Sequence, residues 1–511
     1  MTLHGVLQEL QNYTLYGNGT ISVNNIHIDS RLCKTQDLFV CVQGFKQDGN
    51  GYAIQAVKNG AGSIITGDLT SLRRFAEDAG YALTEQGLDI EGSLIPVAVV
   101  ENLRFALARV SATRFGNPSR KLRLIGVTGT KGKTTTTYMI RNIFHHVGSP
   151  TGLIGTMGSF VGNRAIETDR TTPEANVIQP LLHQMVGEGI QTCMMEVSSQ
   201  GLNLDRVGCC SFSTALFTNL SRDHIGENEH KTMEEYALAK AKLFSLSKRA
   251  VLNADSDWYT FMRKEADKNP DLDIYTYGID GDYDFAAKQI ETKPDGVTYD
   301  VYEKGVKTCS LEVPIPGRFT VYNSLGAYAV ARLEGIEPMQ IQAGLKQVFV
   351  KGKAEIVPTG RDFTILIDYA HNPDSFENIL TTVKEFAKRT VFLFGCGGDR
   401  NRPRALMGET AGKFADFTII TSDNPRSEDP ESIVQDLEAG IKPTGSPYIC
   451  IVDRKEAIEY AIRHAQPGDV IILAGKGHET YQILKDRTIE FDERVIVADV
   501  LKKIREEEQR I

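Results

Sequence analysis

The 511-residue sequence lacks the features that mark several large classes of protein. None of its eight cysteines shows C-x-x-C spacing, so neither a zinc site nor a disulfide framework is indicated. It contains no run of 18 apolar residues, and its first ten residues, MTLHGVLQEL, lack the basic and then apolar segments of a secretory signal. We therefore expect reduced thiols, no membrane insertion and a cytoplasmic protein.

An excess of positive charge is also missing. Lysine and arginine number 57 against 66 aspartates and glutamates, a net charge of −9, which argues against a nucleic-acid-binding surface. Local basic clusters could still bind an anionic small molecule. There is no solenoid repeat and no low-complexity tract. With 41% hydrophobic and 24% charged residues the chain has an ordinary globular composition, and its length predicts three domains rather than one core.

Short apolar strands alternate with helical stretches along the chain. The alternation is clear up to about residue 112, restarts after a polar segment at 116–121, and restarts again after about residue 351. Such βαβ alternation is typical of α/β domains with mostly parallel sheets. We predict three α/β domains, at residues 1–118, 119–350 and 351–511.

Polar clusters follow the predicted strands where the strands end. They are 128–135 after LIGV, Ser198 after MMEV, 223–224 after ALFTNLS, 423–426 after TIITS and 476–479 after IILA. Ligands of open α/β sheets bind beyond the carboxyl ends of the strands. Because two successive sheets carry such clusters, we expect a site in a cleft between two domains.

The stretch GVTGTKGKTTTTYMI, from Gly126 to Ile140, predicts a strand, a glycine-rich turn and a helix. In the usual phosphate-loop spacing the first glycine would stand at Val127, one place later than Gly126, so the loop is a variant form. Backbone N–H groups at the helix N-terminus, a lysine and a threonine hydroxyl for Mg²⁺ would hold a nucleotide phosphate. The predicted loop residues are Gly129, Thr130, Lys131, Gly132, Lys133, Thr134 and Thr135.

The order GxTGTxGKTT, together with DNPR at 423–426 and GKGHE at 475–479, resembles the Mur ligases. The resemblance covers the whole chain. It implies a smaller N-terminal α/β domain that binds a UDP substrate, a central P-loop ATPase domain with a parallel sheet, and a Rossmann-like C-terminal domain that binds an amino acid. It also implies ATP and Mg²⁺ as cofactors, and we expect a monomer.

The implied reaction is an ATP-dependent, ADP-forming ligation in peptidoglycan precursor synthesis. It would join a diamino acid to UDP-N-acetylmuramoyl-L-alanyl-D-glutamate through an acyl phosphate. In this family DNPR is associated with meso-diaminopimelate. The alternatives are the same ligation with L-lysine or another diamino acid, a polyglutamate-type amide ligase, and a nucleotide-regulated binding protein with a decayed ligase site.

Candidate metal ligands lie at strand ends in the central domain. Glu196 ends an otherwise apolar strand, where a carboxylate is costly unless it is paired, and His224 follows the next strand. Taken alone, Glu196 could form a buried salt bridge and His224 could be structural. The resemblance implies that both bind Mg²⁺ along with Thr134, and that Lys133, Glu196, His224 and Lys240 are catalytic.

Lys240 lies on the apolar stripe of a predicted helix formed by Met233, Tyr236, Leu243 and Phe244. A lysine in such a stripe commonly extends its amine outward to solvent. If it is buried instead, its pKa falls, and a neutral amine can react with CO₂. The segment resembles the family's carboxylated-lysine segment, which implies a carbamate at Lys240 acting as a further metal ligand.

The remaining substrate contacts rest on the resemblance. Each serine or threonine taken singly could equally be an ordinary turn residue. The implied contacts with the UDP substrate are Ile28, Ser30, Phe45, Lys46, Gln47, Arg170, Thr171, Thr172, Ser198 and Arg206. The implied contacts with the base and ribose of ATP are Asn323, Asp368 and His371.

The predicted amino-acid pocket lies in the last domain. An arginine fork can bind a carboxylate bidentately and an aspartate can bind an ammonium, and meso-diaminopimelate differs from lysine by a second carboxylate. The predicted pocket residues are Arg400, Asp423, Asn424, Pro425, Arg426, Gly475 and Glu479.

Overall fold

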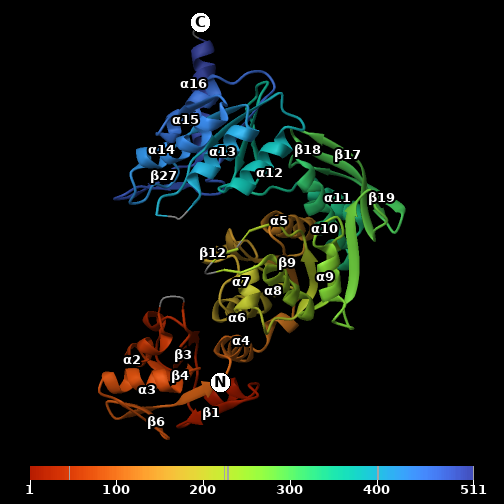
Figure 1. Ribbon diagram of the computed structural model, residues 1–511. Helices are drawn as coiled ribbons and strands as arrows, with labels where there is room; N and C mark the ends of the chain where they lie inside the picture. Colours follow the sequence, from red (N-terminus) through yellow and green to blue (C-terminus); the bar gives the residue numbers. More distant parts are fainter. Residues whose placement is uncertain (45–46, 224, 227–228, 400–401, 510–511) are drawn as a thin grey trace. The chain divides into compact units, whose positions relative to one another are not determined.

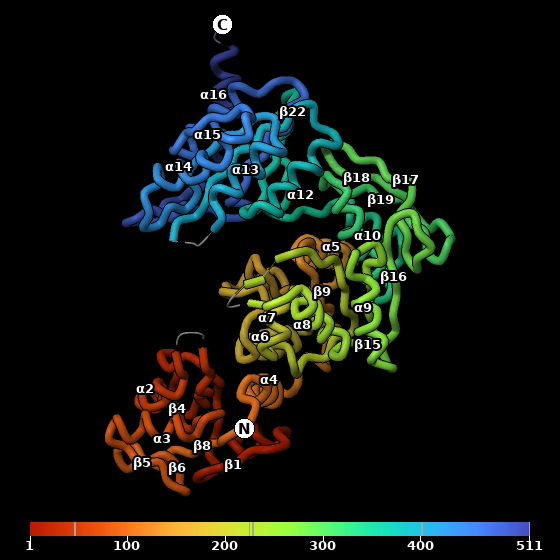
Figure 2. Tube along the Cα trace, viewed as in Figure 1, coloured from red at the N-terminus to blue at the C-terminus, as the bar shows by residue number. Residues whose placement is uncertain are grey.

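The computed structural model describes residues 1–44, 47–223, 225–226, 229–399 and 402–509 (Figures 1 and 2). The chain forms two compact units, Met1–Tyr277 and Gly278–Ile511. The domain boundaries at 118 and 350 stay predictions. None of the described helices is both long enough and apolar enough to cross a membrane.

The first unit begins with a five-stranded sheet in the order β1-β8-β4-β3-β2. Its strands are parallel except β1, which pairs antiparallel with β8. Their bounds are β1 (Tyr13–Tyr16), β2 (Ile26–His27), β3 (Asp37–Val40), β4 (Ala61–Thr66) and β8 (Val97–Val100). The helices are α1 (Leu3–Leu7), α2 (Ala53–Lys58), α3 (Leu69–Asp78) and α4 (Leu103–Arg114), and a small separate sheet contains β5 (Ala82–Thr84), β6 (Gly87–Ile90) and β7 (Ser93–Ile95). The polar segment at 116–121 contains a 3₁₀ turn, Pro118–Arg120.

A second sheet of the first unit has β9 at its centre, between β13 and β14. Its parallel strands are β9 (Arg123–Thr128), β10 (Thr151–Gly155), β13 (Thr192–Glu196), β14 (Phe212–Phe217), β15 (Ser247–Asn253) and β16 (Asp273–Ile279). An antiparallel edge is formed by β11 (Gly158–Val161) and β12 (Arg164–Ile166). The helices are α5 (Lys133–His146), α6 (Ala175–Gly187), α7 (Ser199–Asn203), α8 (Met233–Ser245) and α9 (Tyr259–Ala266).

Helices cover both faces of this second sheet. Leu124, Cys193 and Met195 face a core shared with α6, α7, α8 and α9, whereas α5 contacts β9, β10 and β13. Every residue of β13 is buried, as expected for a parallel strand covered on both faces. The predicted βαβ alternation is confirmed here, and it directs the ends of β9, β13 and β14 to one edge of the sheet.

The second unit begins with an antiparallel meander of β17 (Phe285–Lys293), β18 (Gly296–Glu303) and β19 (Val306–Val313). Two helices, α10 (Arg318–Leu333) and α11 (Pro338–Lys346), pack against it. The hydroxyls of Tyr299 and Ser324 lie 2.6 Å apart between β18 and α10.

A six-stranded sheet follows in the order β20-β21-β25-β22-β23-β24, parallel except for β20. The strands are β20 (Glu355–Val357), β21 (Thr364–Asp368), β22 (Arg389–Phe394), β23 (Phe417–Ile420), β24 (Tyr448–Cys450) and β25 (Asp469–Ala474). The helices are α12 (Pro373–Val383), α13 (Arg404–Phe414), α14 (Pro430–Ile441), α15 (Arg454–Arg463) and α16 (Glu493–Glu508), and a hairpin joins β26 (Tyr481–Ile483) to β27 (Thr488–Glu490).

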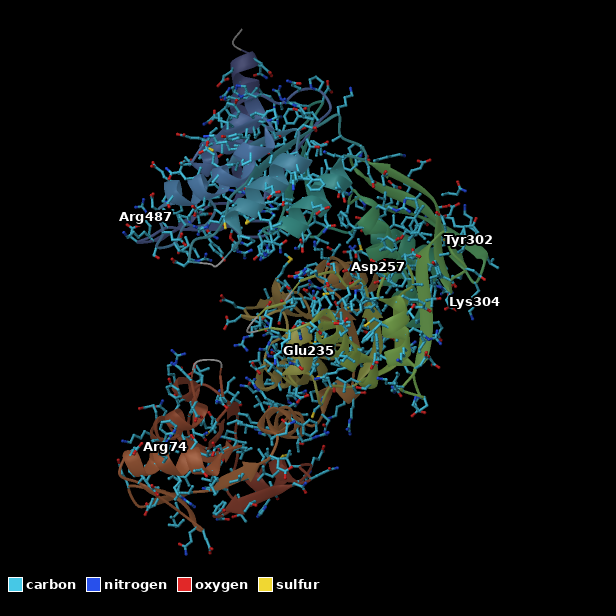
Figure 3. The ribbon with its side chains drawn as sticks, viewed as in Figure 1. Arg74, Glu235, Asp257, Tyr302, Lys304 and Arg487 are labelled. Atoms are coloured by element: carbon cyan, nitrogen blue, oxygen red, sulfur yellow. The ribbon has the colours of Figure 1, made fainter. Side chains whose placement is uncertain are left out.

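Alternate residues of this sheet face opposite layers of helices. Ile471 and Leu473 of β25 share a core with α15 and α16. On the other face Phe376 of α12 packs edge-on against Phe392 and Phe394 of β22. The sheet is doubly wound, as predicted for a Rossmann-like domain. Charged side chains of both signs, such as Arg74, Glu235, Lys304 and Arg487, lie on the outside (Figure 3).

Candidate active site

The glycine-rich turn joins β9 to α5, as predicted. Gly129 has φ +147° and Gly132, the N-cap of α5, has φ +85°, backbone conformations that favour glycine. Gly126 lies earlier, inside β9, where a Cβ atom would come within 2.9 Å of the Phe212 ring. Gly126 is therefore a packing residue rather than part of the turn, which explains the unusual glycine spacing.

Two residues after β14 hold the turn in place. Asn219 accepts the N–H groups of Thr130 and Lys131, at 2.9 and 3.0 Å, with its backbone and side-chain oxygens respectively. Thr218 donates its hydroxyl to the Lys131 carbonyl at 2.7 Å. A Cβ on Gly129 would lie 2.0 Å from the Thr218 hydroxyl, so only glycine fits there. The turn conformation is fixed from outside its own segment.

The N-terminus of α5 has the features of a phosphate site. The Lys133 ammonium donates to the carbonyls of Gly129 and Thr130 at 2.9 and 2.8 Å, so its charge lies over the turn. N–H groups at a helix N-terminus lack partners in the helix, and the helix dipole favours an anion there. The geometry suits a nucleotide phosphate.

The carboxylate of Glu196, the last residue of β13, contacts both this turn and Thr156, the residue that follows β10. Its carboxylate accepts the Thr134 hydroxyl at 2.8 Å and both the N–H and the hydroxyl of Thr156, at 2.9 and 3.0 Å. The Thr156 hydroxyl in turn lies 2.9 Å from that of Thr171. Glu196 is only 1% exposed. One buried carboxylate thus connects the phosphate turn with the predicted substrate threonines.

The other predicted substrate residues of the first unit gather around Thr172. Its hydroxyl donates to the Glu196 carbonyl at 2.8 Å and accepts the Ser198 N–H at 2.9 Å. Arg206 donates to the Thr172 carbonyl at 3.0 Å. The arginines at 104, 170 and 206 all form ion pairs with a single carboxylate, that of Glu174. The structure therefore brings Thr171, Thr172, Ser198, Arg170 and Arg206 together.

Lys240 is buried in the apolar stripe of α8 and does not extend its amine to solvent, whereas Lys242 is exposed. The Lys240 ammonium donates to the Gly129 carbonyl at 2.8 Å and lies 4.4 Å from the centre of the Tyr236 ring. Burial lowers the pKa of Lys240 well below its usual value, and the charge of Lys133 lowers it further. An amine with reduced proton affinity thus contacts the phosphate turn directly.

Several predicted site residues lie outside the described part of the chain, namely Phe45, Lys46, His224 and Arg400. Of the other predicted UDP contacts, Ser30 is buried at the start of the 3₁₀ turn Ser30–Leu32, Ile28 is partly buried and Gln47 is exposed. No group of three or more His, Cys, Asp or Glu side chains that could hold a metal occurs among the residues that the structure describes. Glu196 and Thr134 supply adjacent oxygen atoms, the ligand type that Mg²⁺ prefers.

A pocket in the second unit collects most of the predicted amino-acid contacts. It opens where β22, β23 and β25 end. It is lined by His371, Gly395, Cys396, Gly397, Arg402, Asp423, Asn424, Arg426, Gly475 and Glu479. The lining holds arginines and carboxylates together, so it offers partners for both charges of an amino acid.

Hydrogen bonds fix how the pocket side chains point. The Asn424 side-chain oxygen accepts from the Lys476 ammonium and the Ile483 N–H, at 3.1 and 2.9 Å, so its amide nitrogen points the other way and donates to Glu479 at 2.9 Å. Arg426 has φ +53° and donates to the Gly398 carbonyl at 2.9 Å. Gly475 has φ +113°, and a Cβ there would lie 2.5 Å from the Asp423 carboxylate.

The predicted ATP contacts of the second unit have different surroundings. His371 lines the pocket described above, and burial together with the Arg402 charge lowers its pKa to about 4. Asp368 accepts the N–H groups of Ala354 and Ala370, both at 2.7 Å. Asn323 is buried in α10.

Models of three protein families match successive parts of the chain. The Mur ligase family catalytic domain matches residues 22–114, the Mur ligase middle domain 127–331, and the Mur ligase glutamate ligase domain 352–477. The chain belongs to the Mur ligase family. The resemblance of its motifs and the predicted three-domain α/β fold are thereby confirmed.

Individual Mur ligases are similar over their whole length. The UDP-N-acetylmuramoyl-L-alanyl-D-glutamate--2,6-diaminopimelate ligase of Caldanaerobacter subterraneus subsp. tengcongensis is 45% identical over 98% of both chains. The enzyme of the same name from Clostridium perfringens is 41% identical over 98% of this chain and 99% of its own. A solved structure of such a ligase matches 99% of both chains with a TM-score of 0.69 at 29% identity.

Sequence reasoning missed several residues of this Mur ligase site. Thr156 and the pair Thr218 and Asn219 hold Glu196 and the phosphate turn, and Glu174 pairs with the three arginines. The strand-end rule could have found Thr156, since it directly follows β10. The local sequence shows only the pair with Arg170, four residues before Glu174, whereas Arg104 and Arg206 come from other segments.

Proposed function

We propose that this protein is an ATP-dependent amide ligase that adds meso-diaminopimelate to UDP-N-acetylmuramoyl-L-alanyl-D-glutamate, with ADP and phosphate as the other products. It would act as a monomer in the cytoplasm, where ATP and the UDP-linked precursor are found. The names of the full-length relatives support the choice of substrates.

The bonding of Glu196 carries the proposal. Its carboxylate accepts from Thr134 of the phosphate turn and from Thr156, whose hydroxyl contacts Thr171. A nucleotide phosphate on the turn and a substrate on the threonine pair would therefore meet at one buried anion. Direct phosphoryl transfer between two substrates requires such proximity.

In the proposed mechanism the D-glutamate carboxylate attacks the γ-phosphorus of ATP, forming an acyl phosphate and releasing ADP. Lys133 and the N–H groups of the turn offset negative charge on the transferred phosphoryl group. Glu196 and Thr134 would hold Mg²⁺, which when bound supplies further positive charge beside the phosphates. The diamino-acid amine then attacks the acyl carbon, phosphate leaves and the amine loses a proton.

The mixed charge of the C-terminal pocket favours a substrate with a carboxylate and an ammonium at the end that it recognises. Arg402 and Arg426 can bind a carboxylate, and Asp423 and Glu479 can bind an ammonium. L-Lysine has only an ammonium at its distal end, so it would leave an arginine of the pocket without a carboxylate partner. A site built around a polar group can reject an analogue that lacks this group by on the order of 10⁴-fold.

The test is a panel of amino acids with ATP, Mg²⁺ and the UDP-muramoyl dipeptide. Product is measured by mass spectrometry and ADP by a coupled assay. We expect ADP and tripeptide in equal amounts. The rate with meso-diaminopimelate should be far higher than the rates with L-lysine, L-ornithine and glutamate. ATP loss without a peptide product, or a preference for another amino acid, would contradict the proposal. Arg426→Lys should reduce the ratio of the rate with meso-diaminopimelate to the rate with L-lysine.

We also propose that Lys240 is carboxylated. Its buried amine can react with CO₂ to give a carbamate and a proton, and the product would add a carboxylate beside the turn. Incubation with ¹³C-bicarbonate should give one carbamate ¹³C resonance that is absent from Lys240→Met and present in Lys242→Met. An unchanged spectrum in Lys240→Met would refute this modification.

A further inference from the structure

A buried ion pair lies just outside the amino-acid pocket. Arg454 and Glu493 are the first residues of α15 and α16, and both side chains are 0% exposed. Two guanidinium nitrogens of Arg454 lie 2.9 and 2.8 Å from one oxygen of Glu493. Burying two charges costs so much free energy that such pairs are weak contributors to stability. Another role should therefore account for this pair.

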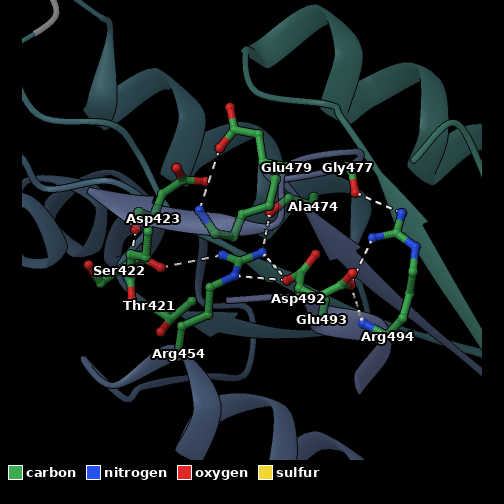
Figure 4. Close-up of polar contacts among 12 residues, drawn as sticks. Thr421, Ser422, Asp423, Arg454, Ala474, Gly477, Glu479, Asp492, Glu493 and Arg494 are labelled. Carbon is green, nitrogen blue, oxygen red and sulfur yellow. Dashed lines mark hydrogen bonds and ion pairs between the residues drawn. The ribbon is translucent and has the colours of Figure 1, made fainter. Parts of the chain in front are cut away.

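The other contacts of Arg454 reach two strand ends. Its guanidinium donates to the Ser422 carbonyl at 3.4 Å and to the Ala474 carbonyl at 2.8 Å. Figure 4 shows the guanidinium between Ser422 and Ala474, with Glu493 also bonded to it. Ser422 comes shortly after β23, and Ala474 is the last residue of β25.

These two strands are not neighbours in the sheet. The order β25-β22-β23 places β22 between them, so no backbone ladder joins β23 to β25 directly. The Arg454 guanidinium bonds to a residue at each of these two strand ends, and the Glu493 carboxylate compensates its charge. The pair thereby links two strand ends that the sheet itself connects only through β22.

The residues that follow these strand ends line the pocket. Asp423 follows Ser422 and Gly475 follows Ala474, and a Cβ on Gly475 would lie 2.5 Å from the Asp423 carboxylate. The Lys476 ammonium bridges the same two segments by donating to the Asn424 side chain at 3.1 Å. A change in the spacing of the strand ends would therefore move Asp423 and Asn424 relative to Gly475.

We propose that Arg454 and Glu493 are positioning residues for the amino-acid pocket. Neither lines it; together they hold the segments at 422–424 and 474–476 at the spacing that the substrate requires. The proposal rests on the proposed function only in taking this pocket as the diamino-acid site.

A matched pair of substitutions tests the idea. Glu493→Gln removes the charge from the buried carboxylate bound to Arg454. Asp469→Asn does the same to a carboxylate that is 1% exposed and bound to Arg389, at the opposite ends of β25 and β22. Both changes weaken an ion pair between an arginine and a buried carboxylate in the second unit, but only the Arg454–Glu493 pair lies near the pocket.

We expect Glu493→Gln to raise KM for the diamino acid about 10-fold or more, because small displacements of binding groups are costly. KM for ATP and for the UDP substrate should stay within about twofold, since the phosphate turn and the substrate threonines belong to the first unit. Asp469→Asn should leave all three KM values near wild type. The proposal is overturned if both variants behave alike, or if Glu493→Gln changes the three KM values equally.

Hydrogen exchange without any substrate separates this proposal from the proposed function. Backbone amides at 422–426 and 474–479 should exchange faster in Glu493→Gln than in wild type or Asp469→Asn. Unchanged exchange would refute the positioning role even if the enzyme uses another amino acid. Should Glu493→Gln fail to fold, Arg454→Lys provides the same test, because lysine keeps the charge but lacks the planar fork that spans both carbonyls.

Discussion

Removing one arginine at a time from around Glu174 should destabilise the first unit in the order Arg206, Arg104, Arg170. All three guanidiniums pair with the same carboxylate, which is 8% exposed, but they differ in burial. The Arg206 side chain is 8% exposed, Arg104 25% and Arg170 51%. Solvent screens an exposed pair, whereas loss of a buried partner leaves the Glu174 charge less well compensated away from water, so exposure should decide the effect.

The expected magnitudes follow from these exposures. Arg206→Met removes a buried ion pair and the bond to the Thr172 carbonyl, which should cost about 3 kcal/mol, the low end for buried pairs because Glu174 keeps two partners. Arg104→Met should cost about 1 kcal/mol and Arg170→Met about 0.4 kcal/mol. Methionine keeps most of the apolar stem, so the comparison isolates the charged group.

The assay is urea unfolding followed by tryptophan fluorescence. The chain has a single tryptophan, Trp258, which packs against the core of the first unit, so the signal reports this unit. Equal decreases in the free energy of unfolding for Arg170→Met and Arg206→Met would refute the reasoning. KM for the UDP substrate gives a second readout: if Arg170 binds substrate, Arg170→Met should raise this KM although it hardly changes stability.

Three further outcomes are expected. Burial lowers the Lys240 pKa in the folded protein, so the unfolded chain binds more protons between the folded and unfolded pKa values. In bicarbonate-free buffer the free energy of unfolding should therefore rise with pH across that window. Lys240→Met should lose both this rise and the ligase activity. His371, with a pKa of about 4, should show no ¹³Cε1 titration by NMR from pH 5.5 to 8; a midpoint near 6.5 would contradict its burial. Gly475→Ala, which would push a methyl group into Asp423, should raise the diamino-acid KM at least about 10-fold while KM for ATP stays unchanged; equal rises in both would point to global damage.

Local patterns in the sequence were enough to predict the main elements and the phosphate turn. A glycine with positive φ, a strand followed by a helix and an apolar stripe are each encoded within about 15 residues, since they depend on backbone sterics and side-chain period. Gly129, Gly132 and Lys133 were found in this way, and so was the apolar face of α8, although the apolar stripe alone did not predict that the Lys240 amine is buried. The strand-end rule placed Glu196, Ser198 and Asp423 at the edges where the structure has them.

The contacts that hold these groups in place depend on tertiary structure. Asn219 reaches the phosphate turn from 88 residues away, Arg104 reaches Glu174 from 70, and Asn424 reaches Glu479 from 55. Strand order and register bring such residues together, and neither can be read from local periodicity because many orders satisfy the same pattern. Only in the formed sheet does His371 line the amino-acid pocket, and only there can Arg454 bond to the strand ends on both sides of β22. The sequence by itself therefore determined the candidate groups for the chemistry, because they belong to local patterns, and the fold decided which partners bind and orient them.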